Sequence, residues 1–136
     1  MIPGDLQAPR LARSARLGDT NVMSGMTVQL GDLDFSGVAP IEEWAAPGGE
    51  CLFAAMVRPD PEKRPADFKV VYFGESANLS SADQLRENPK FRCWVSEAGS
   101  LSNLFIGTIA VPGVDEDTRK RWVRGLCDQY HPICNW

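Results

Sequence analysis

The residues of this chain that could carry chemistry gather first in the segment Tyr72–Leu79. This segment follows an apolar run, Phe68–Phe73, whose β-branched and aromatic residues favour a buried strand. Gly74 then allows the backbone to turn sharply or to pass close to another group. The sequence therefore predicts that a strand ends at Phe73 and opens a polar turn. Such a turn either presents a site or is a plain exit from the sheet.

A second group of candidate residues lies near the C-terminus. Cys127, His131 and Cys134 have the spacing C-x₃-H-x₂-C, and Cys93 could supply a fourth ligand to zinc. However, Cys127 falls on the apolar stripe of a predicted helix, and a buried free cysteine is a common small hydrophobic residue. We therefore expect core packing and no bound metal, with His131 as a helix cap or a surface residue. Four cysteines without a C-x₂-C pair are too few for a disulfide scaffold.

A third candidate is a basic cluster, in which Arg119, Lys120, Arg121 and Arg124 would contact a phosphate backbone. The alternative is a solvated helix face, because acidic residues on the same helix balance these charges. The formal net charge of −4 gives no electrostatic footprint for tight, non-specific binding to nucleic acid.

Length and composition favour one ordinary globular domain. The chain has 136 residues, of which 43% are hydrophobic and 24% charged. No apolar run approaches the roughly 18 residues that cross a bilayer, and the N-terminus lacks the apolar region of a secretory signal. We therefore expect a cytoplasmic location and no membrane partner. Residues 1–25 are expected to be a flexible tail and residues 26–136 the domain; the oligomeric state stays open.

Several predicted elements would position these residues. Residues 50–58 are apolar on both faces, which predicts a central strand covered on both sides. A loop rich in proline, residues 59–67, would join it to the strand 68–73 as an antiparallel hairpin. Residues 27–33 alternate moderately and could form a short edge strand. Residues 35–44 read as a lead-in with buried anchors.

The second half of the chain predicts helices around one more strand. After a weak helix at 80–87, Asn88-Pro89 should begin a helix that ends at Gly99. A strand is expected at 103–111, and Asp115 should cap a final helix. The apolar stripe of that helix comprises Trp122, Val123, Leu126, Cys127 and Tyr130. The fold class is therefore α+β, with a small, mainly antiparallel three-stranded sheet flanked by helices.

Three segments, taken in order, carry a resemblance to a known family. Cys51-Leu52-Phe53 is followed by Tyr72-Phe73-Gly74, which continues as Glu75-Ser76-Ala77-Asn78-Leu79, and the chain closes on Pro132-Ile133-Cys134-Asn135. Their order and spacing resemble a GIY-YIG nuclease domain, with its two tripeptides, its "YIG-x-S-x-N-L" segment and its "P-x-x-N" ending. Cys93-Trp94 and Ala98-Gly99 lie between the motifs, as in small bacterial members. The resemblance covers about residues 27–136.

The resemblance implies a catalytic site whose groups this chain has largely replaced. In the family, two tyrosines, an arginine and a glutamate surround one divalent metal and hydrolyse a phosphodiester. Carried over in that order, these groups fall on Phe53, Tyr72, Ala82 and Arg124. Only Tyr72 keeps its chemistry, because Phe53 has no hydroxyl, Ala82 has no charge, and an arginine cannot ligate a cation. Gly74, Asn78 and Asn135 keep other positions of the family's motifs.

The resemblance thus implies a nuclease fold that has lost most catalytic groups and binds nucleic acid or a protein without a cofactor. One alternative is an active endonuclease that uses Mg²⁺ or Mn²⁺, with Glu75, Arg86 or Asp128 in place of the lost groups. A second alternative is a structural or regulatory subunit.

Overall fold

The structure, a computed structural model, describes residues 26–60, 62 and 68–135. The strands are β2 (Met26–Leu30), β3 (Leu33–Pro40), β4 (Cys51–Val57), β5 (Lys69–Ser76) and β6 (Leu104–Ala110). The α-helices are α1 (Ala82–Arg86), α2 (Phe91–Ala98) and α3 (Glu116–Tyr130), and the 3₁₀ helices are η2 (Leu101–Asn103) and η3 (Ile133–Asn135). The predicted tail, most of the predicted 59–67 loop and Trp136 lie outside the described residues.

The predicted α+β class is confirmed, but the prediction of three strands is wrong. The described residues form a five-stranded sheet in the order β2-β3-β6-β4-β5, with every neighbouring pair antiparallel. The edge strand expected within residues 27–33 is confirmed as β2. Residues 35–40 are not a lead-in, because they belong to a further strand, β3, that pairs with β2 and β6. The register is irregular between Met26 and Val28 and between Ser36 and Ala39. These irregularities interrupt the alternation of apolar and polar residues that identifies a strand in a sequence.

Strand β4 is the centre of the sheet, as its sequence predicts. It pairs with β5 on one side and with β6 on the other, and all seven of its residues are buried. The predicted antiparallel hairpin of β4 and β5 is also confirmed. A strand that is apolar on both faces must be covered on each face. In this structure a separate apolar cluster packs against each face of β4.

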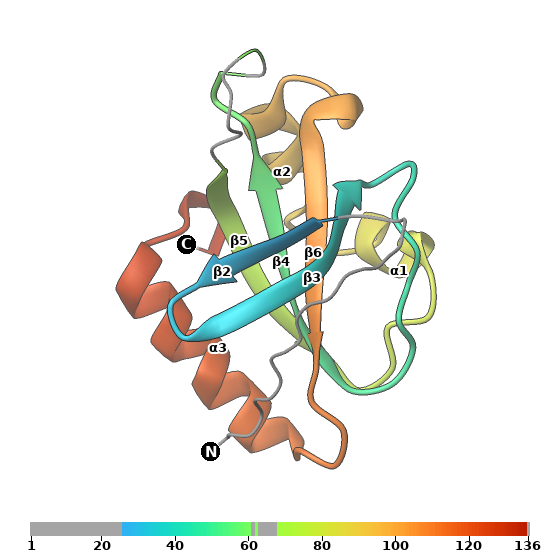
Figure 1. Cartoon of the computed structure of the whole chain (residues 1–136), viewed down its shortest axis with the longest axis vertical. Helices are drawn as coiled ribbons and strands as arrows, with labels where there is room; N and C mark the ends of the chain where they lie inside the picture. The colour runs from blue at the N-terminus through green and yellow to red at the C-terminus, as the bar shows by residue number, and fades with distance from the viewer. Residues whose placement is uncertain (1–25, 61, 63–67, 136) are drawn as a thin grey trace.

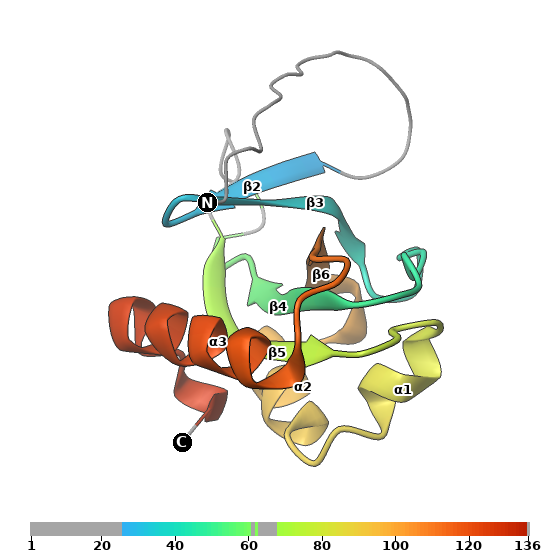
Figure 2. The same ribbon diagram turned by 90° about the horizontal axis from the view of Figure 1, so that it is seen from below.

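The sheet is strongly curled, so that β2 and β3 cross in front of β4 and β5 (Figure 1). One apolar cluster, here the hairpin-side cluster, lies between the hairpin, the central strands and α3, and includes Phe35, Leu52, Phe73 and Leu126. The second, the helix-side cluster, lies on the opposite face under α1 and α2 and includes Phe53, Val71, Leu85 and Trp94. Figure 2 shows the hairpin and these two helices on opposite sides of β4.

Gly107 permits the curl, because β3 passes very close to β6 there. A Cβ at Gly107 would lie 2.7 Å from Cγ2 of Val38 on β3. No larger residue fits that crossing without displacing the hairpin, so the hairpin-side cluster is closed by this close approach.

The ends of the two longer helices follow their predicted signals with one correction. Asp115 caps α3, accepting a hydrogen bond from the Thr118 backbone N–H at 2.9 Å. Gly99 ends α2 in the left-handed conformation. Lys90, not Asn88, is the N-cap of α2; the Asn88 side chain instead accepts a hydrogen bond from the Lys90 N–H at 2.8 Å. Asn88 therefore shapes the turn just before the helix.

A disulfide that the sequence analysis did not predict joins Cys93 on α2 to Cys134 in η3. Their Cα atoms lie 5.8 Å apart although the residues are separated by 41 positions. Cys51 and Cys127 are free and buried. The bridge ties the end of the described chain to the helix-side cluster.

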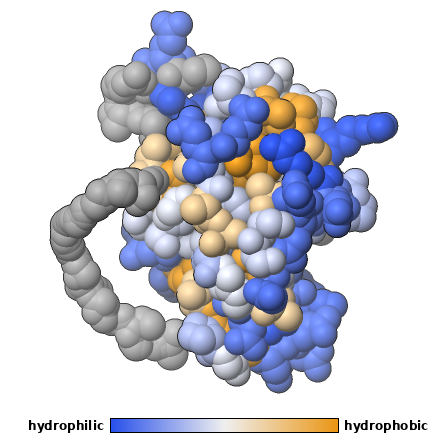
Figure 3. Space-filling model, turned by 90° about the vertical axis from the view of Figure 1, so that its right-hand side faces the viewer, coloured by the Kyte–Doolittle hydropathy of each residue, from blue (hydrophilic) through white to orange (hydrophobic). Residues whose placement is uncertain are grey.

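The surface of the domain is mixed in character. On the face in Figure 3, hydrophilic side chains divide the hydrophobic residues into separate patches.

Among the described residues, no helix combines the length and apolar composition that crossing a bilayer requires.

Candidate functional site

The segment with the most candidate residues is a continuous strand, so the predicted turn at Gly74 is wrong. Strand β5 runs through Gly74 to Ser76, and Gly74 pairs with Phe53 of β4. A Cβ at Gly74 would lie 2.4 Å from Cζ of Phe53 and 2.9 Å from Cε2 of Tyr72. The glycine is required because the Phe53 ring covers it across the strands.

Tyr72 belongs to an aromatic group that packs against the helix-side cluster. Its ring centroid lies 5.9 Å from that of Phe53 and 5.0 Å from that of Trp94. Its hydroxyl accepts a hydrogen bond from Nδ2 of Asn88 at 3.4 Å, at the edge of the accepted range. Tyr72 is half-buried. The phenol is thus held by packing as well as by Asn88.

Four residues stand at the positions of the family's catalytic groups, and the structure brings only three of them together. Ala82, at the start of α1, packs with Tyr72 against the helix-side cluster. Arg124 lies exposed on α3, whose buried apolar residues belong to the hairpin-side cluster. No described contact joins Arg124 to Tyr72. Phe53, Tyr72 and Ala82 therefore form one region, and Arg124 lies apart from it.

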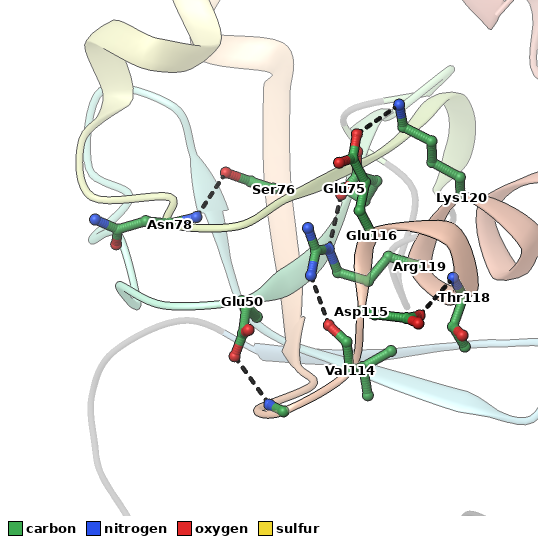
Figure 4. A network of polar contacts seen from close by, with 11 residues as sticks. Glu50, Glu75, Ser76, Asn78, Val114, Asp115, Glu116, Thr118, Arg119 and Lys120 are labelled. Atoms are coloured by element: carbon green, nitrogen blue, oxygen red, sulfur yellow. Dashed lines mark hydrogen bonds and ion pairs between the residues drawn. The ribbon is translucent and has the colours of Figure 1, made fainter.

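Asn78 and Asn135 both hold backbone segments in place. Asn78 Oδ1 accepts a hydrogen bond from the Gly49 N–H at 2.9 Å, which joins the loop after β5 to the loop before β4. The Asn78 N–H donates to Oγ of Ser76 at 3.2 Å (Figure 4). The Asn135 side chain accepts from the Phe73 N–H at 2.9 Å and donates to the Phe73 C=O at 3.0 Å.

Glu75 and Arg119 form an ion pair that the sequence analysis missed. Nε of Arg119 lies 2.7 Å from Oε1 of Glu75, with side-chain exposures of 6% and 17%. Nη1 of Arg119 also donates to the Val114 C=O at 2.6 Å (Figure 4). The hydrogen bond to Glu75 raises the pKa of the Arg119 guanidinium. Both groups are therefore occupied, and Glu75 is not a free substitute for a lost catalytic carboxylate.

This ion pair also corrects the predicted basic cluster. Arg119 is buried, with 5% relative exposure, and does not belong to an exposed basic surface. Lys120 pairs with Glu116 of the same helix at 2.8 Å on the surface. Arg121 and Arg124 are exposed on α3.

The remaining candidates do not assemble into a metal site in the part of the chain that the structure describes. Cys134 is bonded to Cys93, and burial raises the pKa of the Cys127 thiol. His131 is exposed and caps α3 in the left-handed conformation, as predicted. Arg86 and Asp128 are exposed on α1 and α3. Across the described ranges, no three His, Cys, Asp or Glu side chains gather closely enough to hold a cation.

A groove of about 580 Å³ was not predicted from the sequence. It lies beside the first half of β5 and the C-terminal end of α3, and is lined by Leu30, Phe68, Lys69, Val70, Tyr130, His131 and Ile133. Tyr130 and Ile133 are large hydrophobic residues with exposures of 36% and 49%. Tyr130 ends the apolar stripe of α3 and Ile133 follows three residues later, which is the signal that the sequence could have offered.

The fold and this surface define a class: an α+β domain with a curled antiparallel sheet and an apolar groove at the edge strand β5. Comparisons with protein-family models, curated proteins and solved structures gave no match to the chain.

The buried ion pair leads to a stability prediction. We expect Glu75→Ala to lower the melting temperature by about 5–10 °C, because it leaves the Arg119 guanidinium buried without a carboxylate. Glu116→Ala removes an exposed partner of Lys120 and should shift the melting temperature by no more than about 2 °C. Thermal unfolding followed by circular dichroism measures both. Equal shifts would show that the Glu75–Arg119 pair contributes no more than a surface pair.

Proposed function

We propose that this protein is a non-hydrolytic protein-binding domain with a GIY-YIG-like fold. The observation that supports it is the groove beside β5, where hydrophobic side chains are exposed next to an edge strand. An extended segment of a partner protein would lie in this groove and use the edge of β5.

The residues at the family-equivalent positions support a binding role over hydrolysis. Phe53 is buried and has no hydroxyl, and Ala82 brings no charge that would stabilise a phosphorane-like transition state. Arg124 would repel a divalent cation. Tyr72 remains, but as part of an aromatic group.

The chemistry of the groove indicates the kind of segment that fits. Five of the lining residues are hydrophobic, two are the basic or titratable residues Lys69 and His131, and none is acidic. An extended segment with alternating apolar side chains and a carboxylate complements this lining. Unpaired backbone groups on an edge strand are a template for an added strand. At Phe73 this edge is already occupied by the Asn135 side chain, so the added segment would pair with the part of β5 that lines the groove.

The charges of α3 make nucleic acid the weaker candidate. Arg119 is buried against Glu75, and Lys120 is paired with Glu116. Arg121 and Arg124 remain on a chain whose formal net charge is −4. Affinity for nucleic acid depends on the number of phosphates that cations neutralise, so a tight complex is not expected.

A library of displayed random peptides, selected on the full chain, tests the proposal. We expect enrichment of apolar, acid-containing peptides, and at least about tenfold weaker binding to Ile133→Asp in fluorescence titrations. Met26→Asp is the matched control, because Met26 is another exposed large hydrophobic residue, 46% exposed, but does not line the groove.

Four outcomes would overturn the proposal. Failure to enrich any peptide, or equal weakening by Met26→Asp, removes the groove as the binding surface. Salt-dependent binding to single-stranded DNA or RNA that is lost in Arg121→Ala/Arg124→Ala would identify nucleic acid as the partner. Cleavage of plasmid DNA or RNA with Mg²⁺ or Mn²⁺, abolished by Tyr72→Phe, would restore the endonuclease alternative and make Arg86 and Asp128 the next residues to test.

A further inference from the structure

The disulfide lies directly beside the contact that covers the edge of β5. Cys134 is bonded to Cys93 on α2, and the next residue, Asn135, makes both hydrogen bonds to Phe73. β5 is an edge strand, so Asn135 occupies the place where the backbone of a neighbouring strand would lie. The disulfide therefore helps to hold in place the Asn135 side chain, which bonds to Phe73 as a neighbouring strand would.

We propose that the Cys93–Cys134 disulfide is a redox latch that controls the exposure of the β5 edge at Phe73. In the oxidised protein, the bridge anchors η3 and keeps the Asn135 amide on Phe73. In the reduced protein, η3 is held only by non-covalent contacts, and Phe73 loses its hydrogen-bond partner more often. The latch does not depend on the partner proposed above.

The reaction is a two-electron thiol–disulfide exchange with a dithiol reductant. Cys93 is half-buried and Cys134 is 1% exposed, so the thiolate of the reductant reaches the sulfur of Cys93 first. A bond forms to that sulfur, the Cys93–Cys134 bond breaks, and Cys134 leaves as a thiolate that takes up a proton. The second thiol of the reductant then displaces Cys93. The products are two cysteine thiols and an oxidised, cyclic reductant.

The other two cysteines are poorly placed to interfere with this exchange. Cys51 is fully buried, and burial raises the pKa of its thiol to about 11. Cys127 is also buried, and the same cause raises the pKa of its thiol. Because the thiolate is the attacking species, both remain thiols near neutral pH and do not scramble the bridge.

Hydrogen exchange of backbone amides in the folded full-length protein tests the latch. The amide of Ile106, a fully buried residue in the middle of the sheet, reports global opening. On adding dithiothreitol, we expect the Phe73 amide to exchange at least about tenfold faster than the Ile106 amide, with little dependence on low denaturant. In the oxidised protein the two amides should exchange at similar rates.

Two variants separate the latch from a purely structural bridge. Asn135→Ala keeps the disulfide but removes the bonds to Phe73, so it should show the fast Phe73 exchange even when oxidised. Cys93→Ser/Cys134→Ser should show it with or without dithiothreitol. The latch is overturned if Phe73 and Ile106 exchange in step in both redox states, or if reduction unfolds the whole protein. Four free thiols in the air-oxidised protein, counted by alkylation and mass spectrometry, would also overturn it.

Discussion

Loss of the Cys93–Cys134 disulfide is expected to lower the free energy of unfolding by about 4 kcal/mol. The bridge closes a loop between residues that are separated by 41 positions, and cross-linking such a loop removes conformational entropy from the unfolded chain. This loss is a large fraction of the stability of an ordinary domain. Urea unfolding of the wild-type protein, with and without a reductant, measures it.

The matched control is the variant Cys93→Ser/Cys134→Ser, whose stability should equal that of the reduced wild-type protein and should not change with reductant. A wild-type protein whose unfolding midpoint is insensitive to reductant would contradict the prediction. Cys51 and Cys127 are free thiols in both proteins, so they cannot explain a difference.

Gly74→Ala is expected to destabilise the protein by about 3 kcal/mol, because the added methyl group has no space. The new Cβ would lie 2.4 Å from Cζ of Phe53, closer than real Cβ atoms approach. The Phe53 ring cannot easily move away, since its centroid lies 5.9 Å from that of Tyr72 and 6.2 Å from that of Trp94. Either the aromatic group or the pairing of β4 with β5 must shift. Chemical denaturation measures the loss.

The same substitution at Gly125 is the matched control. Gly125 is exposed in the interior of α3, and a Cβ there would meet nothing within 4 Å. Gly125→Ala should therefore stabilise the protein, by up to about 1 kcal/mol, through helix propensity alone. The double variant Phe53→Leu/Gly74→Ala should lose less stability than the two single variants lose in sum, because the smaller Leu side chain makes room for the methyl group. Additive losses would exclude the proposed clash.

Local signals predicted the elements that depend on nearby residues. Apolar residues on both faces of 51–57 predicted a central, doubly covered strand, and β4 is buried at every position. Asp115 and Gly99 predicted one helix start and one helix end, and both are confirmed. The short edge strand expected within residues 27–33 is present as β2, but β3 was missed because a register irregularity and Gly37 interrupt its alternation of apolar and polar residues.

The candidate site was less accessible to sequence reasoning. The sequence identified Tyr72 and Gly74 as neighbours in a special segment, but not that Phe53 covers Gly74 across the sheet. It assigned Arg119 to an exposed basic cluster, whereas the pairing with Glu75, 44 positions away, buries it. The groove beside β5 was not predicted at all, because its lining residues come from three distant parts of the chain.

The sequence by itself therefore determined the α+β class, the central strand β4, the end of α2 at Gly99 and the start of α3 at Asp115, because periodicity and capping act between residues close in the chain. Only the tertiary structure decided the curled five-stranded sheet, the Glu75–Arg119 pair, the Cys93–Cys134 bridge and the groove. Each of these joins residues that are far apart in sequence, and such contacts depend on which strands pair and how tightly the sheet curls, which no local pattern encodes.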